Sequence, residues 1–390
     1  MTFDTIIIGG GIIGCTTGFF LSRRGHKILL IDRAEIATGT TANSFAWANA
    51  TTKTNDAAYH ALNLAGQQGY YALADEFGAD TLGLKPKGAL HLATQDDPEN
   101  WAETKEIAQA LDALNYPSEW LSPAQLRALE PNMTFPPEAH ALYTPTDISI
   151  NAPHFTRFLV AKIIAMGGVV RPACQPLELL ATDAGTVTGI RTETDSYYAP
   201  NVIVATGANT PQTLADLTGY DGFTSGFPMA TPPGLILTTP PLPDALLPNR
   251  IILTSRTREL HILPEFNGGL KIASDDIDGL IISDQSPENL TLNGQRLLTR
   301  CQTLIPDLPN HVDIKDCTLG IGVRPYPTDG KTIAGPMPDA QGLYVIATHS
   351  GITLAPAIGT LMAELVMTGN TPAALAPFGI ERFAGFGGTV

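Results

Sequence analysis

The hydrophobic pattern at the N-terminus predicts a βαβ unit. Thr5 to Ile8 form a short β-branched run, which is typical of a buried strand. A stretch of small and apolar residues follows and ends at Gly25, as a helix does before a C-terminal glycine. Lys27 to Ile31 form a second apolar run. These segments together have the length of one βαβ unit, about 30 residues.

The turn between the first strand and the helix carries glycines with the GxGxxG spacing, at Gly9, Gly11 and Gly14. Such glycines permit a tight turn, close approach of a pyrophosphate and close packing of the helix on the strand. Asp32 ends the second strand, where a carboxylate can accept a hydrogen bond from a ribose hydroxyl. The pattern predicts dinucleotide binding. The alternative is that the glycines only tighten a turn.

The rest of the chain mixes helical and strand-like segments. Helical spacing predicts helices over 56–77, 99–114, 122–130, 151–166, 289–304 and 353–367. Short apolar runs predict strands over 88–93, 169–170, 177–181, 187–193, 201–205 and 343–347. Between 226 and 276 the pattern changes to short strands separated by Pro and Gly, at 235–239, 251–254, 259–263 and 270–274. We expect these strands to form a separate antiparallel sheet.

Composition narrows the class of protein. The 390 residues are 44% hydrophobic and 16% charged, which is unlike a disordered chain. There are 38 Asp and Glu against 23 Lys and Arg, which gives a formal net charge of −15. Because so acidic a surface repels phosphate backbones, no nucleic-acid partner is predicted.

The cysteines favour a reduced, cytoplasmic protein. They are spread without a CxxC pair or zinc-site spacing, at Cys15, Cys174, Cys301 and Cys317. No HExxH motif is present either, so no metal site is predicted. Two apolar stretches, 6–21 and 351–367, are broken by glycines or by Pro356 and Glu364. We predict both as buried core elements, and membrane association is not expected.

Five segments together resemble the FAD-dependent amino-acid and amine oxidoreductases typified by D-amino acid oxidase, glycine oxidase and sarcosine oxidase. They are IIIGGGIIGCTTGFFLSRRGHKILLIDR at 6–33, TGTTANSFAWAN at 38–49, VIVATGANT at 202–210, GVRPYPTDGKTIAGP at 322–336 and GLYVIATHSGITLAPAIG at 342–359. The likeness covers nearly the whole chain, and the order of the motifs is that of the family.

The resemblance implies an α/β fold with two parts. One is a discontinuous, Rossmann-like FAD-binding domain over 1–80, 148–215 and 318–390. The other is an α+β substrate domain with a mainly antiparallel sheet, over 81–147 and 216–317.

The implied reaction is oxidation of the C–N bond of an amino acid or N-substituted amino acid to an imine, by hydride transfer to FAD. Oxygen or another electron acceptor would reoxidise the flavin. One alternative is a flavin-carrying subunit of a multi-subunit amine or amino-acid dehydrogenase. A nicotinamide dehydrogenase is another, but it gives no role to the loop at 38–44 or to the THSG segment.

The resemblance also implies the residues of the site. Arg324 matches the family arginine that holds the substrate carboxylate, with a structural salt bridge as the alternative. Tyr326, His261 and His349 are weaker candidates for the pocket, each with a structural role as its alternative. The residues predicted to bind the cofactor are Gly9, Gly11, Ile12, Ile13, Gly14, Asp32, Arg33, Thr40, Thr41, Asn43, Ser44, Leu177, Ala205, Thr206, Gly207, Arg324, Ser350, Gly351, Ile352 and Thr353.

The sequence departs from the family pattern at two positions. Asp32 stands where most members have Glu, which shortens the acid by one methylene group. Gly322 aligns near the cysteine that links the flavin covalently in the sarcosine oxidase branch, and glycine cannot form a thioether. Cys317 lies five residues upstream, and we expect it to be a buried apolar residue. Phe45 and Trp47 either border the flavin or belong to the core.

Overall fold

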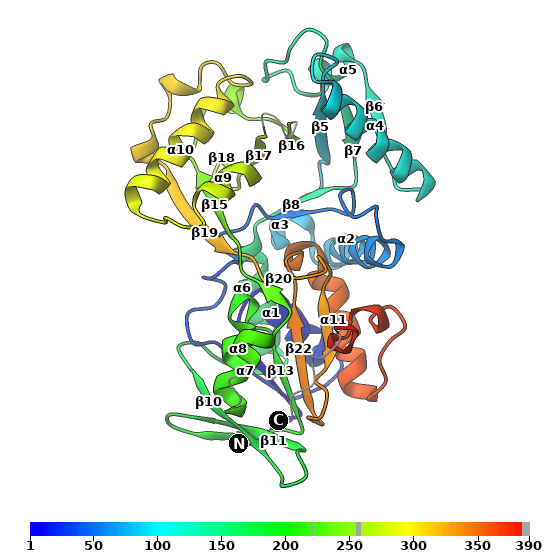
Figure 1. Cartoon of the computed structure of the whole chain (residues 1–390), viewed down its shortest axis with the longest axis vertical. Helices are drawn as coiled ribbons and strands as arrows, with labels where there is room; N and C mark the ends of the chain where they lie inside the picture. The colour runs from blue at the N-terminus through cyan, green and yellow to red at the C-terminus, as the bar shows by residue number, and fades with distance from the viewer. Residues whose placement is uncertain (220–221, 255–258, 384–390) are drawn as a thin grey trace.

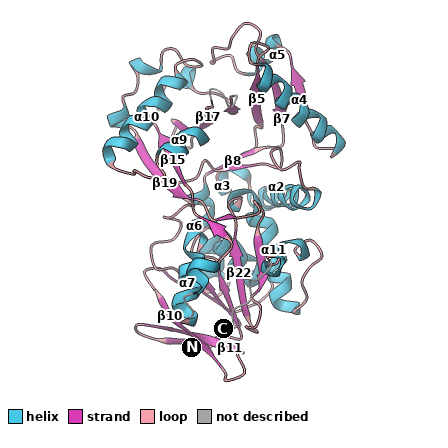
Figure 2. Cartoon of the chain, in the orientation of Figure 1, coloured by secondary structure: helices cyan, strands magenta, loops and turns pink. Residues whose placement is uncertain are grey.

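Two large sheets organise the chain, and they lie one above the other along the longest axis of the molecule (Figure 1). The computed structural model describes residues 1–219, 222–254 and 259–383. Helices pack against both sheets, so each forms the centre of its own apolar core (Figure 2).

The first sheet has six strands in the order β21-β22-β13-β1-β2-β9, parallel except for the β21–β22 pair. The strands are β1 (Thr5–Ile8), β2 (Ile28–Ile31), β9 (Val169–Arg171), β13 (Asn201–Val204), β21 (Ile333–Pro336) and β22 (Leu343–Ala347). The sequences TIII of β1 and ILLI of β2 are wholly buried, as expected for parallel strands covered on both faces.

Alternate side chains of this sheet enter two separate cores. Ile7 points into a core formed with four helices, α1 (Ile12–Arg23), α2 (Ala57–Phe77), α6 (Ala152–Ala165) and α11 (Gly351–Thr368). Ile6 and Ile8 point into the opposite core, which includes α7 (Thr210–Thr218) and a three-stranded sheet. That sheet consists of β10 (Pro176–Ala181), β11 (Val187–Thr192) and β12 (Ser196–Tyr198).

The second sheet has eight strands in the order β19-β15-β18-β17-β16-β5-β7-β6. They are β5 (Ala89–Ala93), β6 (Glu119–Leu121), β7 (His140–Thr144), β15 (Pro233–Thr238), β16 (Ile251–Leu253), β17 (His261–Pro264), β18 (Leu270–Ala273) and β19 (Thr318–Val323). All neighbours are antiparallel except β16 and β5. The helices that pack on it are α4 (Pro98–Ala113), α5 (Pro123–Leu129), α9 (Asp275–Leu280) and α10 (Pro287–Cys301).

Short strands connect the two halves. β3 (Trp47–Ala48), β8 (Ile148–Ile150) and β4 (Leu84–Lys85) form a three-stranded sheet between them, and β14 (Met229–Ala230) pairs with β20 (Tyr326–Pro327). The chain also has two short helices, α3 (Ala79–Leu82) and α8 (Gly222–Gly226).

The predicted α/β fold with a mainly antiparallel second sheet is confirmed, with shifts at element ends. The last helix begins at Gly351, two residues before the predicted start. The short strands of 226–276 do not form a sheet of their own, because β5, β6, β7 and β19 extend it. β19 therefore lies in the second sheet, although the predicted division gave residues 318–323 to the cofactor part. Residues 384–390 of that part lie outside the described residues.

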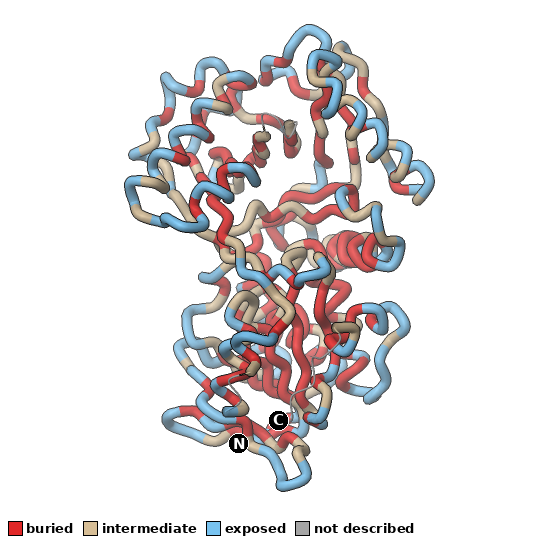
Figure 3. The backbone as a smooth tube through the Cα atoms, viewed as in Figure 1, coloured by how far each residue is buried: buried red, intermediate tan, exposed pale blue. Residues whose placement is uncertain are grey.

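Helix α11 is long and apolar enough to cross a membrane by length and composition, but 61% of it is buried within the protein. It packs against α1 and α2, which agrees with the prediction of a buried core helix (Figure 3). The contact between α2 and α11 depends on glycines. A Cβ atom on Gly66 would lie 2.2 Å from the Thr353 carbonyl oxygen, and one on Gly69 would lie 2.5 Å from Cβ of Pro356.

We expect Gly66→Ala to destabilise the protein by roughly 1–3 kcal/mol, because the added methyl group forces α2 away from the start of α11. Denaturant unfolding measures the effect. Gly279→Ala is the matched control, since the Cβ of this α9 glycine would meet no atom within 4 Å. There the better helix propensity of alanine should leave stability unchanged or raise it. Equal effects of the two substitutions would contradict the packing argument.

Candidate active site

A cavity of about 620 Å³ lies where the two halves meet, which is within the usual size range for small-molecule sites. The first sheet contributes residues at the carboxyl ends of β1, β13 and β22, the place where open α/β sheets bind ligands. The second sheet contributes residues of β15, β17, β18 and β19, together with α9. The segment from Asp32 to Lys53, the start of α11 and residues of α7 also line the cavity.

Backbone contacts around the first turn leave no room for side chains at Gly9 and Gly14. Gly9 has φ of +124°, and a Cβ there would lie 2.3 Å from the Ala205 carbonyl oxygen. A Cβ on Gly14 would lie 1.9 Å from the Gly9 carbonyl oxygen. Gly11 is different, since its Cβ would meet only the Thr41 hydroxyl, at 3.3 Å. Gly9 and Gly14 are therefore required for the backbone, whereas Gly11 keeps the cavity wall open.

The Asp32 carboxylate is fixed beside this turn. Its two oxygens accept hydrogen bonds from the backbone N–H groups of Gly10, at 2.6 Å, and Ala34, at 2.8 Å. Each carboxylate oxygen can accept a further hydrogen bond. Asp32 and Arg33 both line the cavity, so the acid is oriented toward the space where a ribose hydroxyl could donate.

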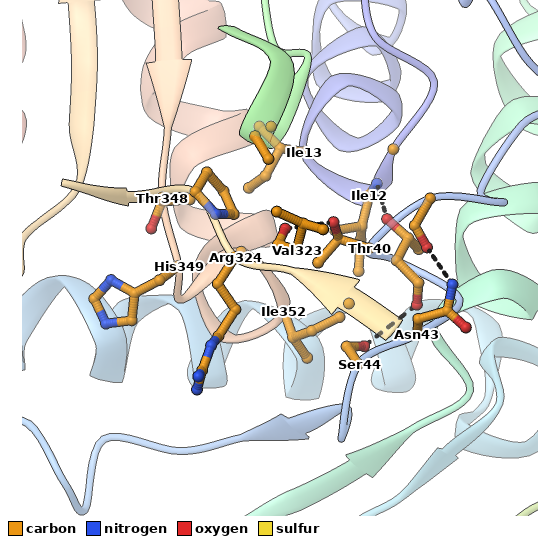
Figure 4. Close-up of a pocket in the computed structure, with 18 of the residues that line it drawn as sticks. Ile12, Ile13, Thr40, Asn43, Ser44, Val323, Arg324, Thr348, His349 and Ile352 are labelled. Carbon is orange, nitrogen blue, oxygen red and sulfur yellow. Dashed lines mark hydrogen bonds between the residues drawn. The ribbon is translucent and has the colours of Figure 1, made fainter. Parts of the chain in front are cut away.

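The loop at 38–44 is held against β19 (Figure 4). The Thr40 hydroxyl donates to the Val323 carbonyl at 2.7 Å, and the Thr41 hydroxyl accepts from the Ile12 N–H at 3.1 Å. A Cβ on Gly322 would lie 2.1 Å from the Asn43 carbonyl oxygen. A cysteine at Gly322 would therefore collide with the loop, which is a physical reason for glycine at this position.

The start of α11 forms the opposite wall. The Ser350 N–H donates to the Thr348 hydroxyl at 3.1 Å, and the Tyr59 hydroxyl donates to the Ser350 side chain at 3.0 Å. Ser350, Gly351 and the following two residues line the cavity. The positive end of the helix dipole therefore faces the cavity, where it favours developing negative charge.

His349 is an uncharged member of the site. Burial lowers its pKa to about 3, and the positive charges of Lys53 and Arg324 act in the same direction. Its Nδ1 atom is buried without a hydrogen-bond partner among the described residues. The ring packs on Tyr326 with 4.3 Å between ring centroids. His349 can therefore offer a neutral hydrogen-bonding group, but no charge, at physiological pH.

Arg324 extends into the cavity away from Ile13 (Figure 4). It has two carboxylate partners. Its Nη2 lies 2.9 Å from Asp278 Oδ2, and its Nη1 lies 3.5 Å from Asp275 Oδ1. Asp278 also accepts from the Leu235 N–H at 2.7 Å, and burial raises its pKa to about 6. The salt bridge considered as the alternative for Arg324 is thus present in the structure.

Most of the predicted site residues line this one cavity. Those that do are Gly9, Gly11, Ile12, Ile13, Asp32, Arg33, Thr40, Thr41, Asn43, Ser44, Ala205, Thr206, Gly207, His261, Arg324, His349, Ser350, Gly351, Ile352 and Thr353. Phe45 and Trp47 also line it.

Three predicted residues do not line the cavity. Gly14 lies beneath the turn, as its packing role requires. Leu177 is 38% exposed, and the chain next to it lines the cavity only at Gln175 and at Pro176, the first residue of β10. Tyr326 is 37% exposed and contacts the site through the His349 ring, so it is not a wall of the cavity.

Sequence reasoning missed Lys53, Asp275 and Asp278, which all line the cavity. Lys53 belongs to a polar segment, TTKTND, and the two acids belong to SDDIDG. Charged residues in such segments are usually solvated. No local signal distinguishes these three from surface charges, and only the folded chain brings them to Arg324.

The cavity fits FAD. The glycine turn is open toward the cavity, the starts of α1 and α11 present positive dipole ends to it, and Asp32 is oriented for a hydroxyl. The comparisons with known proteins agree. Residues 4–365 match the family model described as FAD dependent oxidoreductase. The chain belongs to this family.

Its relatives in sequence include several amino-acid oxidases. Glycine oxidase of Geobacillus kaustophilus is 25% identical over 98% of both chains. One of the subunits of opine oxidase from Agrobacterium tumefaciens is 25% identical over 97% of both chains. The predicted FAD cofactor and oxidoreductase class are confirmed, and the glycine oxidase relatives agree with oxidation of an amino-acid C–N bond.

Solved structures of similar fold cover nearly the whole chain. Glycine oxidase from Geobacillus kaustophilus has a TM-score of 0.80 and 24% identity, with 98% of this chain and 100% of that chain covered. L-proline dehydrogenase from P. horikoshii has a TM-score of 0.81 and 19% identity, with 97% of each chain covered. These two establish the fold.

We expect Gly11→Val to remove bound FAD while the chain stays folded. The backbone tolerates a Cβ at this position, as its nearest contact is a hydroxyl at 3.3 Å, but the branched side chain narrows the space next to the turn. Flavin absorbance per mole of protein measures binding, and circular dichroism measures folding. A folded variant with its full flavin content would contradict the assignment of this turn to the pyrophosphate.

Proposed function

We propose that this FAD-dependent oxidoreductase oxidises the C–N bond of an amino acid or N-substituted amino acid, and that Arg324 holds the substrate carboxylate. The observation that carries the proposal is a guanidinium that enters the cavity from β19, near the start of α11. When bound, the flavin supplies the hydride acceptor, so the chain itself must bind, orient and desolvate the substrate.

The ion pairs of Arg324 support this role and modify it. The Asp275 contact is long, at 3.5 Å, and Asp275 is largely exposed, so an incoming carboxylate can take over that edge of the guanidinium. Asp278 is nearly buried and makes a shorter contact. We therefore infer that Asp278 stays in place and orients the guanidinium while the substrate binds at the other nitrogen.

The reaction does not require a side chain of the protein as a base, and the other groups of the cavity have different roles. His349 is neutral because burial lowers its pKa to about 3, so it can accept or donate a hydrogen bond at the substrate without repelling an amine. The dipole of α11 stabilises negative charge on the opposite side of the cavity. Phe45 and Trp47 provide apolar walls that exclude water.

Replacement of Arg324 by Lys tests the proposal. The charge remains, but the two-pronged donor is lost. We therefore expect kcat/KM to fall by a few tens to a thousandfold, which corresponds to a loss of roughly 2–4 kcal/mol of transition-state stabilisation. Flavin content should be retained. Steady-state kinetics with an amino acid and its decarboxylated amine measures this, and the amine should lose little further activity in the variant. An unchanged kcat/KM, or a wild-type preference for the amine, would show that Arg324 is only structural.

The raised pKa of Asp278 generates a pH dependence. Below about pH 6 this carboxyl is protonated and no longer neutralises Arg324, so the guanidinium should attract a ligand carboxylate more strongly. We expect (ethylthio)acetate, an unreactive analogue, to bind roughly three- to tenfold more tightly as pH falls through 6. Isothermal titration calorimetry measures the dissociation constant. Asp278→Asn should abolish the dependence, and its persistence in that variant would assign it to another group.

A second candidate function is a flavin-carrying subunit that needs a partner protein for turnover. The similarity to the opine oxidase polypeptide, along almost its whole length, favours this alternative. The purified chain, assayed with amino acids and either oxygen or an artificial dye, distinguishes the two functions. Turnover by the chain alone supports an independent oxidase or dehydrogenase, and its absence from a flavin-loaded chain supports the need for a partner.

The domain division and the compartment are parts of the same proposal. We retain a discontinuous cofactor-binding domain over 1–80 and 148–215, and we move the start of its third segment beyond β19, because that strand pairs with β15. A cytoplasmic location is supported by four free cysteines, of which Cys15 and Cys301 are buried.

A further inference from the structure

The cavity contains a second cation that the proposed mechanism does not use. Lys53 lines the cavity together with Arg324, on a different segment of the chain. Arg324 has two carboxylate partners, whereas the Lys53 ammonium forms no ion pair or hydrogen bond with a described residue. A partly buried cation without a direct ion-pair partner loses hydration at a cost, so an anionic ligand would stabilise it.

The backbone around Lys53 is held firmly. The Lys53 N–H donates to the Ala50 carbonyl at 3.2 Å, which closes a turn after β3. The Asn49 N–H donates to the Thr353 hydroxyl at 3.2 Å, and the Thr51 hydroxyl donates to the buried Asp147 carboxylate at 3.3 Å. Lys53 therefore projects from a turn that is tied to the start of α11 and to the core beneath it, not from a free loop.

Lys53 and Arg324 act on the same part of the cavity. Their positive charges both lower the pKa of His349, in addition to its burial. Burial lowers the pKa of Lys53 itself, and the negative charge of Asp275 partly opposes this shift. Lys53, His349, Arg324 and Asp275 are thus within electrostatic reach of one another.

We propose that Lys53 binds a second carboxylate of the substrate, so that the enzyme prefers amino acids or N-substituted amino acids that carry two carboxylates. The proposal rests on the proposed function, in which Arg324 holds the first carboxylate. The chain provides one cation for each anionic end, with the neutral His349 nearby. A monocarboxylic substrate would leave the Lys53 ammonium without a direct ion-pair partner, with only the more distant charge of Asp275 acting on it.

Matched ligands test this with the flavin-loaded protein. Thiodiacetate and (ethylthio)acetate cannot be oxidised at nitrogen, and they differ in one carboxylate that is replaced by a methyl group. We expect the wild type to bind thiodiacetate at least about tenfold more tightly, as one charge-assisted contact predicts. Lys53→Met should remove most of this preference, and Lys53→Arg should restore part of it. Calorimetry gives the dissociation constants without any turnover.

Kinetics with iminodiacetate and N-ethylglycine provides the second readout. In Lys53→Met the ratio of kcat/KM for iminodiacetate over N-ethylglycine should fall about tenfold or more, mainly through KM. Lys315→Met is the matched control, because it removes an equal charge from an exposed side chain outside the cavity. Its ratio should equal that of the wild type. If Lys53→Met does not retain flavin, Lys53→Gln replaces it.

Two outcomes would overturn the proposal. One is equal wild-type affinity for thiodiacetate and (ethylthio)acetate. The other is an equal fall of kcat for both substrates in Lys53→Met. That result would indicate that Lys53 accepts a proton from the substrate amine. If the proposed function itself is wrong, the results differ from both of these. No amine would then be oxidised, and Arg324→Lys would not alter the binding of the two carboxylate ligands. A thiodiacetate preference that depends on Lys53 could still be measured in that case.

Discussion

Close backbone packing around α1 is the constraint on which the site depends. Gly14 lies against the Gly9 carbonyl, so α1 starts directly behind the glycine turn. Gly359 allows α11 to approach Thr16 of α1, and Gly66 allows α2 to approach the carbonyl of Thr353. Since none of these contacts has room for a Cβ atom, the starts of two helices reach one cavity from opposite ends of the sequence.

Edge strand β19 of the second sheet joins that sheet to the first half beside the cavity. β19 pairs with β15 along its whole length, and its glycines lie against Asn43 of the first half. The same strand leads directly into Arg324, so packing between the halves also sets the position of the guanidinium. The loop at 38–44 and Arg324 are therefore parts of one interface, and a change in either should affect the other.

The electrostatics of the cavity come from burial of several charges together. The charges of Arg324 and Asp278 neutralise each other in an ion pair. Burial raises the pKa of Asp278 to about 6. Burial also lowers the pKa of His349 to about 3, which keeps this side chain neutral. In water these groups would titrate near their ordinary values. The low-dielectric cavity makes their protonation states depend on each other and on any carboxylate that enters.

Local sequence was sufficient to predict most of the elements and the glycine turn with its acid, whose residues line the cavity except for Gly14. Apolar runs such as TIII and ILLI, the glycines between them and the acid at Asp32 are adjacent in the chain, so their spacing alone predicts a dinucleotide turn. The pairing of β19 with the second sheet, and the meeting of Lys53, Asp275 and Asp278 with Arg324, involve residues far apart in sequence. Only the tertiary structure decided these, because whether a charged side chain is solvated or buried in a shared cavity depends on segments that its own neighbours in the sequence do not specify.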